Sequence, residues 1–160
     1  MVSPNAAVAI RPAAGADLPA VLALYREVGD KQAVPVARAR KVLARIRSYP
    51  DYDLYVAVHD GEIVGTFALL IMDNLAHGAA PSGVVEDVVV RRDWQRRGVG
   101  RRMMAWAQER CRARGCYKLA LSSNRQRLAA HRFYAALGFQ RHGYSFRVNL
   151  RAAGLRRPST

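Results

Sequence analysis

The first third of the chain carries two stretches in which apolar residues recur at helical spacing. The first stretch starts at Asp17, a residue type that caps helix N-termini. Its apolar residues share one helical face: Leu18, Val21, Leu22 and Tyr25. The second stretch covers residues 37–49 and ends before Pro50, with an apolar stripe among arginines: Val42, Leu43 and Ile46. We expect a short strand over residues 8–12 and then two amphipathic helices.

The pattern then changes to strands. Residues 54–59 and 62–72 predict two strands joined by a tight turn at Asp60–Gly61. A loop follows, and residues 82–90, SGVVEDVVV, form a nearly continuous apolar run that predicts a central strand.

The second half of the chain returns to helices separated by strands. A helix over residues 98–114, closed by Gly115, has one apolar face: Val99, Met103, Trp106, Ala107 and Cys111. Residues 117–122 predict a short strand and residues 127–137 a last helix, which Gly138 ends. Residues 139–150 resemble one or two final strands.

This order of elements predicts the fold class. Strand, two helices, an antiparallel strand run, helix, strand, helix and strand indicate a mixed α/β (α+β) domain with a single-layer, mostly antiparallel sheet of six to seven strands and about four helices. A doubly wound parallel sheet and a DNA-reading helical module do not fit it. We expect one domain over residues 1–160, with a core at about 8–150 and a loose tail at 151–160.

Composition and charge narrow the classes of partner. Apolar residues make up 51% of the 160, which argues against disorder. The formal net charge of +14 attracts polyanions such as nucleic acid, anionic membrane or a phosphate-rich small molecule. Since the arginines are spread along the whole chain, we interpret most of this charge as solvated surface and expect no nucleic-acid partner.

The sequence also predicts a cytoplasmic location without membrane association. Apolar runs are too short to cross a bilayer, and the N-terminus lacks a basic segment followed by an apolar block. Cys111 and Cys116 are too few for a disulfide framework or a metal site, so we expect two reduced thiols.

Residues 95–100, QRRGVG, combine glycines and arginines between the central strand and the next helix. Such a junction exposes the unpaired N–H groups of the first helical turn, where the helix dipole adds positive charge. Gly98 and Gly100 let the backbone approach an anion closely. The spacing matches neither a P-loop nor a dinucleotide fingerprint. We interpret the segment as a pyrophosphate site, with an arginine-coated helix start as the alternative.

Two segments together resemble the GNAT family of N-acetyltransferases. The first, DVVVRRDWQRRGVGRRMM, is similar to the family's signature at Gln95, Arg96, Arg97, Gly98, Val99 and Gly100. The second, LSSNRQRLAAHRFYAALGF, is similar at Asn124, Phe133, Tyr134, Gly138 and Phe139. The likeness runs over about residues 8–150 and is sharp over 84–139. Locally, LSSNRQRLAAHRFY also resembles the aminoalkylphosphonate acetyltransferase branch, and VEDVVV the glucosamine-phosphate acetyltransferases.

The resemblance implies an acyl-CoA N-acyltransferase fold, acetyl-CoA as cosubstrate and no metal. Backbone groups of Val88, Val89 and Val90 would pair with the pantetheine arm, provided that strand 84–90 splays from strand 117–122. Residues 95–101, from Gln95 to Arg101, would hold the pyrophosphate. Asn124 would contact the pantetheine arm, and Tyr134 would protonate the leaving thiolate. The alternative for Tyr134 is a core aromatic residue.

Transfer to an amine also needs a group that takes the amine's proton. Glu86 and Asp87 interrupt an apolar strand, where charge is costly unless it is paired or functional. Strand alternation predicts Glu86 on the face of Val84, Val88 and Val90, and Asp87 on that of Val85 and Val89. We favour Glu86 as the base. Asp87, a chain of waters, and a structural Glu86 paired with an arginine remain the alternatives.

We therefore expect an N-acetyltransferase in which a primary amine attacks acetyl-CoA directly in a ternary complex. The expected partner is a small-molecule amine, with a homodimer as a second option. The rival hypothesis is a regulator of the same fold that binds acetyl-CoA or nucleic acid without turnover. His77, His131 and the aspartates Asp51, Asp53 and Asp73 carry no assigned role.

Overall fold

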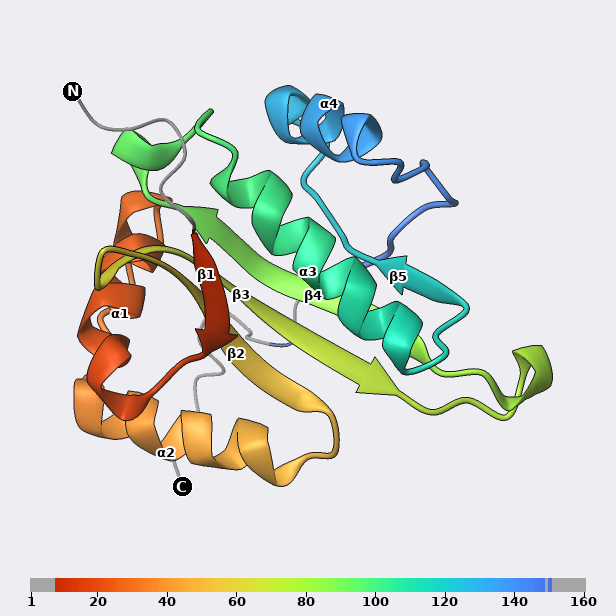
Figure 1. Cartoon of the computed structure of the whole chain (residues 1–160), viewed down its shortest axis with the longest axis horizontal. Coiled ribbons are helices and arrows are strands. Elements are labelled where there is room, and N and C mark those ends of the chain that lie inside the picture. The colour runs from red at the N-terminus through yellow and green to blue at the C-terminus, as the bar shows by residue number, and fades with distance from the viewer. Residues whose placement is uncertain (1–7, 149, 151–160) are drawn as a thin grey trace, which may run out of the picture. The chain divides into compact units, whose positions relative to one another are not determined.

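The computed structural model describes residues 8–148 and 150, and the chain divides into two compact units. The first unit ends at Leu121 and the second begins at Ser122. Figure 1 shows the elements of the two units, coloured from red near the N-terminus to blue toward the C-terminus.

The first unit is built on one five-stranded sheet in which the strands follow one another in chain order. Its strands are β1 (Ala9–Pro12), β2 (Tyr52–His59), β3 (Glu62–Met72), β4 (Ser82–Val90) and β5 (Lys118–Ala120). The first three pairings are antiparallel and the pairing of β4 with β5 is parallel. The mixed, mostly antiparallel single sheet is therefore confirmed.

One face of this sheet is covered by α1 (Leu18–Glu27) and α2 (Val36–Ser48). The residues of the shared core are Ala13, Leu18, Val21, Ala39, Leu43, Leu54, Val56 and Ala68. Leu54 and Val56 alternate with residues that point to the opposite face, as strand geometry requires. The apolar stripe predicted for the first helix thus buries against the sheet. Of the stripe predicted for the second helix only Leu43 belongs to this core, and Val42 and Ile46 are half-buried.

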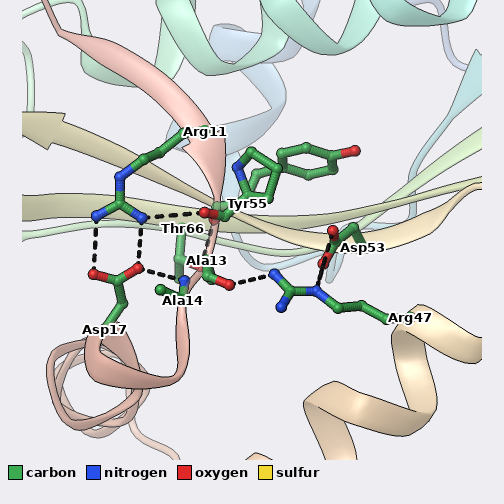
Figure 2. A network of polar contacts seen from close by, with 9 residues as sticks. Arg11, Ala13, Ala14, Asp17, Arg47, Asp53, Tyr55 and Thr66 are labelled. Carbon is green, nitrogen blue, oxygen red and sulfur yellow. Dashed lines mark hydrogen bonds and ion pairs between the residues drawn. The ribbon is translucent and has the colours of Figure 1, made fainter.

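Arginine–carboxylate contacts fasten the loop between β1 and α1 to the rest of this layer (Figure 2). Arg11 binds Asp17 through two hydrogen bonds of 2.6 and 2.9 Å. Asp17 precedes α1 as predicted, but its carboxylate accepts from the Ala14 N–H at 2.6 Å and makes no capping bond to α1. Arg47, on α2, bridges Asp53 at 3.1 Å and the carbonyl of Ala13.

The opposite face is covered by α3 (Val99–Ala113). Trp106 lies with its ring centroid 4.5 Å from Tyr55 and 6.1 Å from Phe67. The buried residues of the helix are Val99, Met103, Met104, Ala107 and Cys111. They match the predicted apolar face, to which Met104 is added. Because only residues 91–98 connect β4 to α3, the helix start lies near the carboxyl end of that strand.

The second unit contains α4 (Leu128–Ala136), close to the predicted 127–137. The expectation of final strands over 139–150 is wrong for the residues that are described: 139–148 and 150 form no strand, and Asn149 lies outside the described residues. The sheet therefore has five strands in the described chain instead of six or seven. The predicted tail, 151–160, also lies outside the described residues.

Residues 139–150 resemble strands in sequence, with alternating apolar residues at 144, 146, 148 and 150. In the structure Tyr144, Phe146 and Val148 are exposed by 90%, 92% and 76%. Apolar alternation without a buried face does not define a strand, since burial against a neighbour is what stabilises the pairing.

Candidate functional site

Where β4 leads into α3, six consecutive backbone N–H groups have no partner in the part of the chain that the structure describes. Within the described residues, no N–H of 96–101 donates to a protein acceptor, and the first helical hydrogen bond runs from Arg102 N to Gly98 O at 2.9 Å. We call residues 96–101 the amide loop. Its donors lie at the positive end of a 15-residue helix, so the loop is suited to an anion.

The backbone conformation of the amide loop depends on two left-handed residues. Arg96 has φ 61° and Gly98 has φ 82°. Successive N–H groups turn to the same side when right- and left-handed residues alternate, which produces an anion-binding concavity. A Cβ at Gly98 would meet no atom within 4 Å, so glycine is required there by its φ angle and leaves the surface above it open.

The arginines around the amide loop fall into two groups. Arg91 pairs with Glu62 at 3.1 Å and with Asp93 at 2.8 Å, and Arg92 donates to the carbonyl of Glu27 at 2.8 Å. These two arginines hold the strand end in place. A second group is exposed and makes no ion pair with any described residue: Arg96, Arg101 and Arg102. That second group is available to an incoming anion.

Trp94 is a residue that the sequence interpretation missed. It lies in a short 3-10 turn, Arg92–Trp94, just before Gln95. The ring stands 4.4 Å from that of buried His59, and the Arg97 guanidinium lies 5.3 Å above it. Trp94 thus anchors the start of the loop on β2. A lone tryptophan inside an arginine run was the signal for this role.

The pairing between β4 and β5 stops early. It joins only Ser82, Gly83 and Val84 to residues 118–120, and β5 ends at Ala120. Beyond Val84 the β5-side edge of β4 has no partner strand within the first unit. Among the described residues the two strands are thus unpaired beyond this point, which the predicted splay requires, and an extended ligand could add to this edge as a strand would.

A β-bulge interrupts β4 at its two acidic residues. Ala68 of β3 pairs with Glu86 but Thr66 pairs with Val89, so β4 holds an extra residue, and Asp87 has φ 52°. Glu86 shares the face of Ala68, which α1 and α2 cover. Asp87 raises the pKa of Tyr25 on α1, so it lies on the same face.

The predicted separation of Glu86 and Asp87 onto opposite faces is therefore wrong. Strict alternation holds only for a regular strand, and the extra residue shifts the period by one. The shift brings the two carboxylates together, in what we call the acidic bulge, and turns Val89 toward the face of Thr66.

The acidic bulge carries charge that no cation among the described residues neutralises. Neither carboxylate forms an ion pair with a described residue, so the alternative of a Glu86–arginine pair is not observed. Desolvation raises the pKa of Glu86, and the charge of Asp87 adds to it. Desolvation and the charge of Asp30 raise the pKa of Asp87. Both side chains still reach solvent, so the bulge is accessible.

Tyrosines surround the acidic bulge. Burial, followed by the charge of Asp87, raises the pKa of Tyr25. Burial also raises the pKa of Tyr52, and the charges of Asp87 and Glu86 raise it further. Neither tyrosine was named as a site residue, because spacing along the chain does not connect α1 and β2 with β4.

Asn124 and Tyr134 belong to the second unit. The Asn124 carboxamide oxygen accepts from Gln126 N at 2.9 Å and shapes the turn before α4. Tyr134 packs edge-on between Phe133 and Phe139, at 5.1 and 5.6 Å. Partial burial raises the pKa of its phenol. His131 bonds the carbonyl of Asn124 at 2.9 Å and so has a structural role.

The remaining candidates have structural contacts. His77 stacks on Tyr117 at 4.1 Å. Asp51 pairs with Arg114, and Asp53 with Arg47. In the described part of the chain, no helix is long and apolar enough to span a membrane, and no three His, Cys, Asp or Glu side chains group as metal ligands would.

Comparison with known proteins matches most of the chain to one family. Residues 20–139 match the model of the acetyltransferase (GNAT) family. A solved structure of a protein from Agrobacterium tumefaciens has a TM-score of 0.83 and 32% identity, and covers 88% of this chain and 99% of that one.

Two curated relatives are similar over part of their length. The glucosamine 6-phosphate N-acetyltransferase of Trypanosoma brucei brucei is 36% identical over 90 residues, 56% of this chain and 59% of that protein. The aminoalkylphosphonate N-acetyltransferase of Salmonella typhimurium is 32% identical over 97 residues, 61% of this chain and 62% of that protein. Because the family model covers most of the chain, this protein belongs to the acetyltransferase (GNAT) family.

Proposed function

We propose that this protein transfers the acetyl group of acetyl-CoA to a primary amine of a small molecule. The observation that carries the proposal is the amide loop: among the described residues its six N–H groups have no acceptor, and the exposed arginines beside them have no acidic partner. This is the chemistry that a pyrophosphate needs, and coenzyme A contains one. Gln95 ends the turn that positions the loop, through its side-chain bond to Val90 O at 3.3 Å.

The open edge of β4 supports a place for the pantetheine arm. The arm carries amides, and it can pair with the backbone of Val88, Val89 and Val90 as an added strand does. An N–H of this edge, such as that of Val88, would then polarise the thioester carbonyl. The early end of the β4–β5 pairing is the feature that makes this edge available.

The acidic bulge supplies the base. An alkylammonium has no lone pair, so a carboxylate or a water held by it must take the proton before the nitrogen attacks the carbonyl carbon. Glu86 is the first choice and Asp87 the second. Their raised pKa values bring both groups closer to the range in which a base is most effective.

Tyr134 is proposed as the acid that protonates the departing coenzyme A thiolate, and Asn124 as a contact of the pantetheine arm. The support is the match of residues 20–139, a range that includes both residues, to the family model. The raised pKa of Tyr134 is compatible with this role, because the phenol stays protonated at neutral pH and has a proton to give.

The acceptor class follows from the acidic bulge and from the relatives. Two unneutralised carboxylates attract a cationic amine. The two curated relatives are named for glucosamine 6-phosphate and aminoalkylphosphonate, both small amines. We therefore propose a small-molecule amine in preference to a protein or nucleic acid.

A screen for coenzyme A release over a panel of amines tests this function. We expect acetyl-CoA-dependent thiol release with at least one small amine and formation of the acetylated product by mass spectrometry. Tyr134→Phe should lower turnover by about tenfold or more while leaving acetyl-CoA affinity unchanged.

The same screen separates the rival function. A protein that binds acetyl-CoA but releases no thiol with any amine class would be a regulator. For a nucleic-acid regulator, affinity for DNA would also fall steeply with salt, and Tyr134→Phe would have no effect on binding. Absence of acetyl-CoA binding by calorimetry would overturn both the proposed enzyme and a regulator that binds acetyl-CoA, and would leave only the nucleic-acid regulator.

A further inference from the structure

The two cysteines of the chain meet at the carboxyl end of α3. Gly115 N donates to Arg112 O at 3.0 Å and Cys116 N to Cys111 O at 2.9 Å, and Gly115 has φ 71°. These two bonds define a Schellman motif, in which the side chains at the positions of Cys111 and Cys116 contact each other. The thiols are hydrogen-bonded side by side, although four residues separate them in the sequence.

The two thiols differ in accessibility. Cys111 is 4% exposed, and Cys116 is partly exposed. Burial raises the pKa of the Cys111 thiol to about 12, and the neighbouring Cys116 adds to it. The pair therefore consists of an outer thiol that a solute can reach and an inner thiol that only its neighbour can reach.

The inner thiol also touches the pairing between β4 and β5. A Cβ at Gly83 would collide with Cys111 Sγ, and it would lie 3.0 Å from Leu119 Cδ1. Gly83 pairs with Leu119 at the centre of the three-residue β4–β5 pairing. The sulfur thus rests on the backbone where these two strands are joined, just before β4 loses its partner.

We propose that Cys111 and Cys116 form a reversible thiol–disulfide site that reacts with low-molecular-weight disulfides. The Cys116 thiolate attacks one sulfur of the small disulfide, forms a mixed disulfide and releases one small thiol. The Cys111 thiolate then attacks the Cys116 sulfur, forms the internal disulfide and releases the second small thiol. Two cysteine thiols are oxidised, one small disulfide is reduced to two thiols, and the two cysteine protons leave with these products.

The internal disulfide is expected to alter the β4–β5 pairing. In the reduced protein Cys111 Sγ packs on Gly83, and forming the bond draws this sulfur toward Cys116. Since Cys116 precedes β5 by two residues, the crosslink ties the helix end to that strand. Hydrogen exchange of the amides of 82–84 and 118–120 should therefore differ between the two redox forms.

Intact-mass analysis of the full chain with excess glutathione disulfide tests the proposal. We expect the wild-type protein to lose two hydrogens without retaining glutathione. Cys111→Ser should accumulate one glutathione at Cys116, with an adduct that lasts at least about tenfold longer than any adduct of the wild type, because no internal thiol resolves it. Cys116→Ser should react more slowly, since its remaining thiol is buried.

The outcomes are distinct. A stable wild-type glutathione adduct, or disulfide-linked dimers on a non-reducing gel, would overturn the proposal. Because a serine hydroxyl buried at position 111 lacks a partner, Cys111→Ala serves as a second variant, and circular dichroism checks that each variant is folded. The result does not depend on acetyl transfer, so the proposed function and this site fail separately.

Discussion

The amide loop, which follows β4, and the acidic bulge, which lies within β4, present opposite charges. The loop offers backbone N–H donors and exposed arginines, and its geometry depends on Gly98. The bulge offers two carboxylates, and its geometry depends on one extra residue in β4. One region suits an anion and the other a cation.

This difference shows how a chain of net charge +14 separates its charges. Arginines neutralise several carboxylates elsewhere in the first unit, including Asp17, Asp53 and Asp51. Glu86 and Asp87 have no such partner among the described residues, although arginine is abundant. Leaving two desolvated carboxylates unpaired costs stability, and such a cost is typical of a functional site.

The largest expected effect comes from removing the proposed base. Glu86→Gln should lower kcat by about 100-fold, because general-base assistance has that magnitude. The raised pKa of Glu86 also predicts that turnover rises with pH above the ordinary value of 4.5, as the carboxylate ionises. Steady-state kinetics across the acidic range measures both effects, and the variant should lose the rising limb.

Asp87→Asn is the matched variant for this first prediction. Asparagine tolerates the left-handed conformation that Asp87 adopts, so the bulge is kept while the charge is lost. A smaller loss of kcat than in Glu86→Gln would assign the proton transfer to Glu86. A rising limb that survives in both variants would replace direct transfer by a chain of waters.

The amide loop should be sensitive to its backbone conformation. Gly98→Ala places a side chain at φ 82°, which costs about 1–2 kcal/mol, and acetyl-CoA affinity should fall about tenfold if the loop opens to avoid the strain. Calorimetry measures the affinity. Gly78→Ala, at φ 68° in the loop before β4, is the control: similar strain should leave acetyl-CoA affinity unchanged.

The arginines should have smaller effects, and the two groups should differ in kind. Arg101→Ala should weaken acetyl-CoA binding roughly two- to fivefold and reduce its salt dependence, as exposed charges do. Arg91→Ala should instead lower thermal stability, since it breaks pairs with Glu62 and Asp93. If both variants lost the same affinity for acetyl-CoA, then an ion pair with an acidic residue would not separate arginines that support the fold from arginines that bind acetyl-CoA.

The sequence predicted the amide loop because its determinants are local. A strand, two glycines and a helix start follow one another within 20 residues, and each has a composition signal. The same holds for most elements: α2 was expected at 37–49 and spans Val36–Ser48, and β3 was expected and found at Glu62–Met72.

The sequence predicted the two acidic residues of the bulge as candidates, but it did not predict the bulge itself. An extra residue in β4 is defined only by pairing with β3, so no period within 82–90 reveals it. The influence of the bulge on the pKa values of Tyr25 and Tyr52, and the ring contact of His59 with Trp94, likewise join distant segments. The strands expected over 139–150 failed for a related reason, because alternation alone does not supply a neighbour.

The smallest expected effect concerns stability. The folded protein raises the pKa of Asp87 above its ordinary 3.8, so it favours the protonated form. The contribution of this protonated form to stability is complete at pH values below the ordinary aspartate pKa of 3.8. It is lost as the pH rises through the raised pKa of Asp87 in the folded protein. Asp87→Asn should therefore increase the free energy of unfolding at neutral pH by less than about 1 kcal/mol, because the side chain reaches solvent.

Denaturant unfolding of wild type and Asp87→Asn at neutral and acid pH measures this gain, which should vanish below about pH 3.8, where aspartate is protonated in both states. Asp60→Asn is the control: Asp60 is also left-handed, at φ 47°, but its side chain is 85% exposed. No change is expected there. A destabilised Asp87→Asn at neutral pH would mean that this carboxylate has a stabilising partner, and the contrast between an unneutralised bulge and a cationic loop would then be wrong.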